Sequence, residues 1–242
     1  MRILVLNWQD WENPKSGGAE VHLKEVFSRI ARSNDVTLFC SSFPHAAPDA
    51  TLSGIHVIRR GGRYLFNIRV FFAYRKTFRG KFDIVIDDWN KIPFFTPLYV
   101  KEPLMGIVHH LFDKSIFTET NWLLATYVYV MERIALKIYR DVPFIVGSKS
   151  THDELLKHGF TEITQINYGV DHDLYRPSVE KPVVEEGFVP LFTRFWIAPD
   201  VDCRPTKAQL KSLERTAMIQ VLCHLGIITL IVGIVLIIIH FS

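Results

Sequence analysis

Short apolar runs recur through the first two thirds of the chain. They lie at residues 3–6, 36–39, 55–58, 82–86, 104–108, 144–146 and 163–166. Continuous apolar runs of this length are typical of parallel strands that are covered on both faces of a sheet. The pattern therefore predicts a buried parallel sheet.

Helical periodicity fills most of the intervals between these runs. One predicted helix presents a single apolar face made by Ala19, Leu23, Val26, Phe27 and Ile30. A long apolar and aromatic helix is expected over 121–139, and a third helix from Ser150, at capping-box spacing from Asp153, to Gly159. Alternating strands and helices predict a Rossmann-like α/β fold with helices on both faces of the sheet. Its ligand is expected outside the carboxyl ends of the strands.

The last part of the chain has a different character. From Ala217 to Phe241 it contains no Asp, Glu, Lys or Arg. At about 1.5 Å per residue, a helix of this length crosses the hydrocarbon layer, so we predict a membrane anchor over 217–241 within a helix spanning 206–242. Lys207, Lys211 and Arg215 precede this run, which places residues 1–216 in the cytoplasm by the positive-inside rule.

Composition narrows the choice of partners. The chain has 242 residues, 48% of them hydrophobic, and a formal net charge of +3. This weak basicity does not by itself indicate nucleic acid, but it suits an anionic membrane surface. Three widely spaced cysteines predict neither a disulfide framework nor a zinc site. The opening residues have too short an apolar run for an export signal and read as a first strand.

Gly17 and Gly18 lie between the first strand and the first helix. Glycines at this edge let a ligand approach the backbone, and the free N–H groups of a helix start favour an anion such as phosphate. A flexible turn is the alternative interpretation. The segment contains neither the dinucleotide-binding nor the P-loop glycine pattern.

Four stretches, taken in order, resemble family 4 glycosyltransferases, which have the GT-B fold. They are "SGGAEVHLKEV" (16–26), "FDIVIDDWNKIPF" (82–94), "GIVHHLF" (106–112) and "IVGSKSTHDELLKHGFTEITQINYGVDHDLYRP" (145–177). The resemblance covers residues 1–177 and implies the N-terminal, acceptor-side half of the GT-B fold.

The resemblance implies a retaining transfer of a sugar, of the hexosyltransferase type, from a nucleotide diphosphate sugar to a hydroxyl acceptor, without a metal or other cofactor. Gly17 and Gly18 would then present backbone amides to the donor diphosphate. His109 falls at the family histidine beside the donor sugar, with His110 as the alternative. Gly169 and Asp171 belong to the hinge passage "NYGVD", in which Tyr168 is an insertion into the family's "NGVD".

Asp87, Asp88 and Asn90 follow the fourth apolar run, at the carboxyl edge of the predicted sheet. Their polar groups suit acceptor hydroxyls. A cap for the following helix is the alternative.

Basic and aromatic residues alternate over 59–81, where Ile68, Phe71, Phe72 and Phe78 fall at helical spacing. We interpret Arg63, Arg69, Arg75 and Lys76 as contacts to anionic lipid; an ordinary sheet-covering helix with a solvated basic face is the alternative. Arginines between aromatics also suit nucleic acid. The predicted anchor makes a membrane the better partner.

The sequence departs from the family pattern after Pro177. The glycine–arginine loop, lysine and paired glutamates of a donor domain are not recognisable, and the linker 178–205 has no identified role. Three hypotheses follow. The chain is a membrane-anchored glycosyltransferase in glycan biosynthesis that acts on a lipid-linked or envelope glycan acceptor, with its donor half built unusually or supplied by a separate protein. Alternatively it is a non-catalytic acceptor-binding scaffold, or a truncated gene product.

Overall fold

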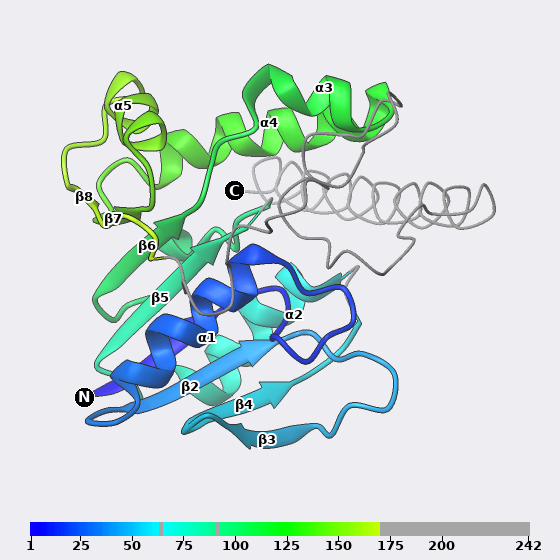
Figure 1. The fold of residues 1–242 in the computed structure, drawn as a ribbon, viewed down its shortest axis with the longest axis vertical. Coiled ribbons are helices and arrows are strands. Elements are labelled where there is room, and N and C mark those ends of the chain that lie inside the picture. The colour runs from blue at the N-terminus through cyan, green and yellow to red at the C-terminus, as the bar shows by residue number, and fades with distance from the viewer. Residues whose placement is uncertain (63–64, 91, 170–242) are drawn as a thin grey trace, which may run out of the picture. The chain divides into compact units, whose positions relative to one another are not determined.

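The computed structural model describes residues 1–62, 65–90 and 92–169, and within them one mostly parallel sheet organises the fold (Figure 1). Its strands are β1 (Arg2–Leu6), β2 (Asp35–Cys40), β3 (Asp49–Leu52), β4 (Ile55–Arg59), β5 (Ile84–Trp89), β6 (Leu104–Val108), β7 (Phe144–Val146) and β8 (Ile163–Gln165). The order across the sheet is β3-β4-β2-β1-β5-β6-β7-β8. Every neighbouring pair is parallel except β3 and β4, which confirms the predicted Rossmann-like α/β class.

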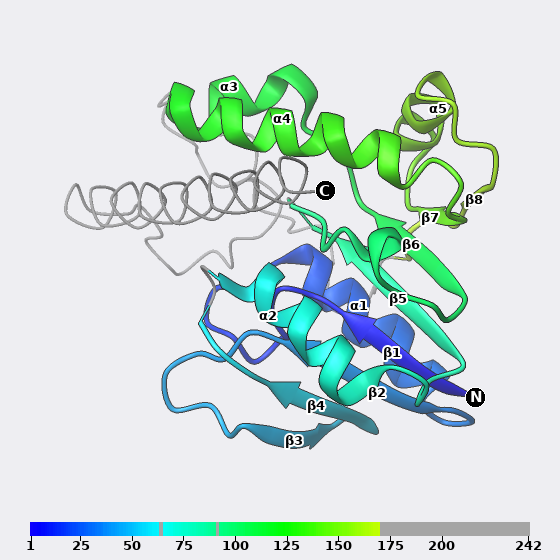
Figure 2. The same ribbon diagram turned by 180° about the vertical axis from the view of Figure 1, so that it is seen from behind.

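Helices cover both faces of the sheet (Figures 1 and 2). They are α1 (Gly18–Ile30), α2 (Phe66–Ala73), α3 (Ile116–Glu119), α4 (Trp122–Ile138) and α5 (Lys149–Lys157). Leu23 and Phe27 of α1 pack with Val5 on one face. α2 and α4 pack on the other, where their side chains meet Leu4 and Leu6 of the same strand. Alternate residues of β1 therefore belong to different cores, as the pleat of a strand requires.

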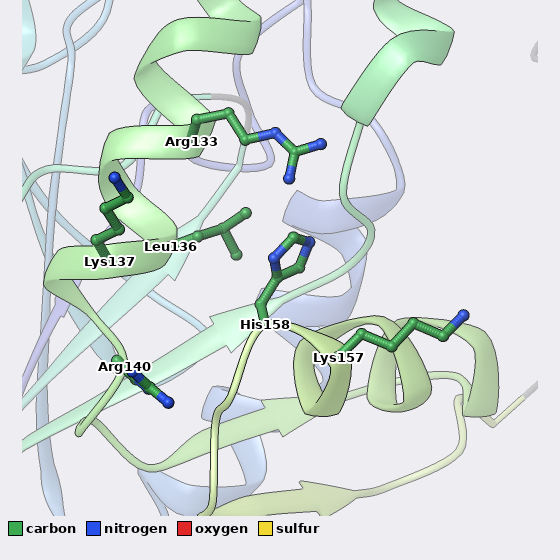
Figure 3. A pocket seen from close by; sticks show the side chains of 6 residues that line it. All are labelled: Arg133, Leu136, Lys137, Arg140, Lys157 and His158. Carbon is green, nitrogen blue, oxygen red and sulfur yellow. The ribbon is translucent and has the colours of Figure 1, made fainter.

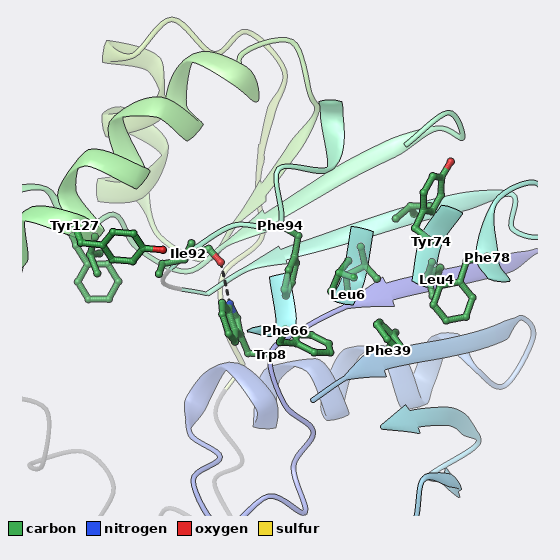
Figure 4. Close-up of a cluster of buried hydrophobic side chains, with 14 of the residues drawn as sticks. Leu4, Leu6, Trp8, Phe39, Phe66, Tyr74, Phe78, Ile92, Phe94 and Tyr127 are labelled. Atoms are coloured by element: carbon green, nitrogen blue, oxygen red, sulfur yellow. Dashed lines mark hydrogen bonds between the residues drawn. The ribbon is translucent and has the colours of Figure 1, made fainter. Parts of the chain in front are cut away.

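The core beneath α2 and α4 is rich in aromatic side chains (Figure 4). Phe66 and Phe39 lie with ring centroids 5.3 Å apart, and Trp8 packs against Phe66 at 6.0 Å. The indole N–H of Trp8 donates to the carbonyl of Ile92 at 3.0 Å, the bond drawn in Figure 4. This bond joins the loop after β1 to the loop after β5, so the two loops that flank the carboxyl edge are fixed to each other.

One strand was not predicted from the sequence, and the predicted start of one helix needs correction. β3 is a short antiparallel edge strand, and its sequence, Asp49 to Leu52, lacks the apolar run by which a buried strand is recognised. α5 begins two residues earlier than predicted, because Ser148 and not Ser150 is its N-cap and accepts the N–H of Thr151 at 3.2 Å. The helix ends as predicted before Gly159, whose φ of +82° is the left-handed conformation that favours glycine.

The buried face of α2 also differs from the predicted one. Phe66, Val70, Tyr74 and Phe78 are buried at a spacing of four, while Phe72 is 52% exposed. Residues Tyr74–Phe78 form a π-helical turn in which the Arg79 N–H donates to the Tyr74 carbonyl at 2.9 Å. This wider turn keeps Phe78 in line with the core.

Several predictions fall outside the described residues. These are Arg63, Asp171, the domain boundary at 177, the linker 178–205 and the anchor 217–241. Among the residues that the structure describes, no helix has the length and apolar character needed to cross a membrane.

Candidate functional site

The candidate site lies where the chain reverses its direction of progress across the sheet. From β1 the chain continues to β2 on one side, whereas β5, on the other side of β1, leads to β6, β7 and β8. The carboxyl ends of β1 and β5 therefore border a topological switch point, the place where open α/β sheets bind ligands. The glycine pair follows β1, and His109 follows β6 at the same edge.

The pleat of β5 separates its two aspartates. Ile86 packs in the core under α1, and Val85 packs in the core on the opposite face. Asp88 therefore points to the α1 side and Asp87 to the α4 side. Of the two, only Asp88 lies on the side of the glycine loop, residues 7–17 between β1 and α1.

Asp87 is fully buried on the α4 side. Its Oδ2 accepts the hydroxyl of Thr96 at 2.6 Å and also the hydroxyl of Tyr139. Burial raises the pKa of this carboxyl to about 6, against the lowering effect of the two hydroxyl bonds. Asp87 thus joins the loop after β5 to the end of α4, and its side chain lies on the face of the sheet opposite to α1.

Asp88 and His109 form the central pair of the site. Asp88 is 1% exposed, and its Oδ1 lies 3.1 Å from His109 Nε2. The other imidazole nitrogen, Nδ1, lies 2.6 Å from the hydroxyl of Tyr168. A carboxylate only accepts hydrogen bonds, so Nε2 carries the proton in the neutral ring and Nδ1 accepts from Tyr168. The site is therefore a three-residue chain, Asp88–His109–Tyr168.

The charge of Asp88 controls the imidazole. Desolvation by burial lowers the pKa of His109, but the attraction and hydrogen bond of Asp88, helped by Glu20, outweigh it and raise the pKa above the ordinary value. His22 on α1 lies edge-on to His109, with ring centroids 5.3 Å apart. Burial, and then repulsion from His109, lower the pKa of His22. The two neighbouring histidines are thus biased toward different protonation states.

Two polar atoms beside this pair are buried and have no hydrogen-bond partner within the described residues: Asp88 Oδ2 and His22 Nδ1. Buried polar atoms normally have partners, because leaving one unsatisfied costs about 1–3 kcal/mol. The site therefore offers an acceptor and an imidazole nitrogen to an incoming polar group.

The start of α1 is open on its outer side. Gly17 is the N-cap with a φ of −137°, and a Cβ there would meet only Glu20 Oε2 at 3.7 Å. Neither the backbone nor the packing of the described residues requires glycine at this position. The missing side chain leaves room for a ligand to approach the first amides of the helix.

Glu20 already accepts one of the backbone N–H groups at this helix start. Its Oε2 accepts the Gly17 N–H at 2.6 Å, and its Oε1 accepts the amide of Asn90 at 3.3 Å. The side chain is 1% exposed. The carboxylate thus caps α1 from within and connects it to the loop after β5.

A buried ion pair supports the loop between β1 and the glycines. Arg59, 2% exposed at the end of β4, donates to both oxygens of Asp10, at 2.7 and 3.0 Å. It also reaches Glu12 at 2.8 Å. The loop is thereby attached to β4 at Asp10 and Glu12, in addition to its covalent connection to β1.

Residues 16–174, more than half of the chain, match Glycosyltransferase Family 4. The chain belongs to this family. No curated protein matches it. The family match covers Gly17 and Gly18, the Asp88–His109 pair and Tyr168, so these residues of the candidate site lie within the family 4 domain.

The other residues predicted to be functional do not form one cluster. His110 is exposed and packs on Phe112, with ring centroids 4.6 Å apart. Asn90 is at the site through Glu20. Arg69, Arg75 and Lys76 are exposed on α2 and the turn after it, and Gly169 is the last described residue.

Sequence reasoning missed three residues of the site, namely Glu20, His22 and Tyr168. Glu20 stands at the third helical position after the Gly17 cap, the capping-box place, and this spacing was a usable signal. His22 and Tyr168 carry no such local signal, because only the fold brings them to His109.

A hollow of about 450 Å³ lies elsewhere, between α4 and α5 (Figure 3). Basic side chains from the two helices and the residues that follow them line it: Arg133, Lys137, Arg140, Lys157 and His158. Lys137 and Lys157 occupy the last turns of their helices, where cations offset the negative end of the helix dipole. None of the candidate site residues lines this hollow.

Within the described part of the chain, no group of His, Cys, Asp or Glu side chains is arranged to hold a metal ion.

Proposed function

We propose that the chain is a glycosyltransferase that moves a hexosyl group from a nucleotide diphosphate sugar to a hydroxyl acceptor, with retention and without a metal. Family membership supports the reaction class. The observation that carries the proposal is the Asp88–His109 pair, which faces the open start of α1 across the switch point.

The donor diphosphate would meet the first amides of α1. Gly17 gives its N–H to Glu20, so the next amides, those of Gly18 and Ala19, remain for the phosphate oxygens. The leaving diphosphate gains negative charge as the sugar departs, and the helix start favours that charge. A protonated His109, stabilised by Asp88, adds a positive charge nearby.

We propose that the acceptor is a lipid-linked or envelope glycan at a membrane surface. α2 supports this, because Phe72 is 52% exposed among the exposed cations Arg69, Arg75 and Lys76. Apolar side chains among cations suit an interface with anionic lipid. The apolar sequence 217–241 supports the same partner.

The test is sugar transfer by membranes from cells that express the full-length chain. Radiolabelled UDP- and GDP-hexoses are supplied, and label is counted in the lipid extract and in the envelope glycan. We expect His109→Ala to reduce transfer by about a hundredfold, the usual effect of losing a group that stabilises transition-state charge. His56→Ala, an exposed histidine on β4, is the matched control and should transfer normally. Undiminished transfer by the His109 variant would contradict the proposal.

A further inference from the structure

Tyr168 occupies the space that a ligand needs in order to reach His109. Its hydroxyl lies 2.6 Å from Nδ1 of His109, the ring nitrogen of that residue that does not contact Asp88. We propose that Tyr168 closes a hydroxyl-binding subsite and that a sugar or other polyol enters by displacing it. The nature of the ligand rests on the proposed function, whereas the closure stands on the contacts of Tyr168 alone.

The chain makes room for the tyrosine ring at Gly147. A Cβ at this position would lie 2.0 Å from Cζ and 2.2 Å from Cε2 of Tyr168, distances that real atoms do not adopt. The backbone of Gly147 does not have a positive φ, so its conformation does not require glycine. The ring therefore lies directly against the Gly147 backbone, and any larger residue there would displace it.

The ring also covers the second histidine. Tyr168 and His22 have centroids 4.7 Å apart at an angle of 67°, and Tyr168 and His109 lie 5.9 Å apart. Tyr168 thus lies against both imidazoles. This arrangement closes the approach to Nδ1 of His109.

The polar atoms left around the ring indicate what would replace it. Asp88 Oδ2 and His22 Nδ1 are buried without partners in the described structure, and Nδ1 of His109 would join them once Tyr168 leaves. These are one carboxylate and two imidazole atoms within a single subsite. Hydroxyl groups satisfy such a set because each both donates and accepts. Tyr168, itself a neutral hydroxyl, is a stand-in for one of them.

Acylation of histidine by diethyl pyrocarbonate tests the closure without any substrate. The reagent transfers an ethoxyformyl group to an unprotonated imidazole nitrogen and releases ethanol and carbon dioxide. In neutral His109 that nitrogen is Nδ1, which Tyr168 covers. Rates for His109 and His110 are measured on the purified full-length chain by peptide mass spectrometry at several pH values, so that neutral imidazoles are compared.

We expect His109 to react at least about tenfold more slowly than the exposed His110, as a closed state favoured about ten to one requires. Tyr168→Ala should remove this protection. Gly147→Ala should also remove it, because it displaces the ring and keeps the tyrosine. Ile166→Ala, an exposed neighbour, is the control and should leave His109 protected.

Equal reactivity of His109 and His110 in the wild-type chain would overturn the closure. So would protection that persists in both variants, provided that circular dichroism shows them folded. Failure of sugar transfer would leave these rates unaffected, so the two proposals fail independently.

Discussion

At the scale of single residues, Asp87 and Asp88 show how one step along a strand changes the chemistry of a carboxyl group. Both are buried, but Asp88 has an imidazole partner that becomes cationic, whereas Asp87 has only the neutral hydroxyls of Thr96 and Tyr139. Burial therefore raises the pKa of Asp87 to about 6, since no positive charge offsets its desolvation. Asp88 therefore belongs to the candidate site, whereas Asp87 belongs to a buried hydrogen-bond network on the α4 side.

This difference predicts how Asp87 affects stability as the pH changes. Its pKa is about 6 in the folded chain and about 3.9 in the unfolded chain, so the folded state binds more protons between these values. The contribution of Asp87 to stability is fully present below about pH 4 and is lost as pH rises through 6, a loss of roughly 3 kcal/mol. In Asp87→Asn this loss is absent.

The measurement is urea unfolding of the wild-type chain and of Asp87→Asn at several pH values from 4 to 8. The free-energy difference between the two should shift by about 3 kcal/mol in favour of the variant across that range. A difference that stays constant with pH would mean that Asp87 titrates normally in the folded state.

At the scale of elements, the start of α1 is determined by Glu20. Its carboxylate accepts the Gly17 N–H and the Asn90 amide within a buried site. Glu20→Gln removes the charge and replaces one of the two acceptor oxygens by an NH₂ group, so one of these donors loses its acceptor. We expect a loss of about 1–2 kcal/mol of unfolding free energy, typical of a broken cap.

Glu25→Gln on the same helix provides the matched control. Glu25 is 53% exposed and pairs with Arg29 across one helical turn. Such exposed pairs contribute about 0.3–0.5 kcal/mol, so urea unfolding should separate the two variants clearly. Equal losses would show that Glu20 is not the cap of α1.

The elements that could be predicted from sequence are those whose pattern is local. β1, β5 and β6 each contain a short apolar run, and α4 has clear periodicity between Asn121 and Tyr139. β3 has no such run. The π-helical turn after α2 changes which residues face the core, and neither residue composition nor spacing reports it in advance.

The site residues can also be divided into those with a local sequence signal and those without one. Gly17, at the start of α1, and His109, directly after β6, were predicted from motifs. The orientation of Asp87 and Asp88 was not predictable, because β5 is buried on both faces and apolar residues occupy both parities. Tyr168 is 59 positions from His109, and only the pairing of β6, β7 and β8 brings the two together.

At the scale of the whole molecule, the Asp10–Arg59 pair connects the site to the far side of the sheet. β4 is separated from β1 by β2, yet Arg59 at its end binds the loop that leads from β1 to the glycines. Both side chains are almost fully buried. A buried charge needs an oppositely charged partner, because removing one member of the pair leaves the other desolvated and uncompensated.

Arg59→Met is therefore expected to lower the free energy of unfolding by about 3–5 kcal/mol, while retaining much of the side-chain volume. Adding Asp10→Asn should recover part of this loss, because the double variant no longer buries a lone charge. Arg60→Met is the control: Arg60 pairs with Asp49 in solvent, both around half exposed, and its loss should cost about 1 kcal/mol or less.

The effect should also reach the site. If the pair holds the glycine loop, amide hydrogen exchange of residues 8–18 will accelerate in Arg59→Met under native conditions and stay unchanged in Arg60→Met. Faster exchange confined to β4 would instead mean that Arg59 stabilises its own strand and that the loop is held by β1 and Glu20 alone. Because Arg59 lies at the end of β4, this measurement decides whether that strand contributes to holding the glycine loop beside the site.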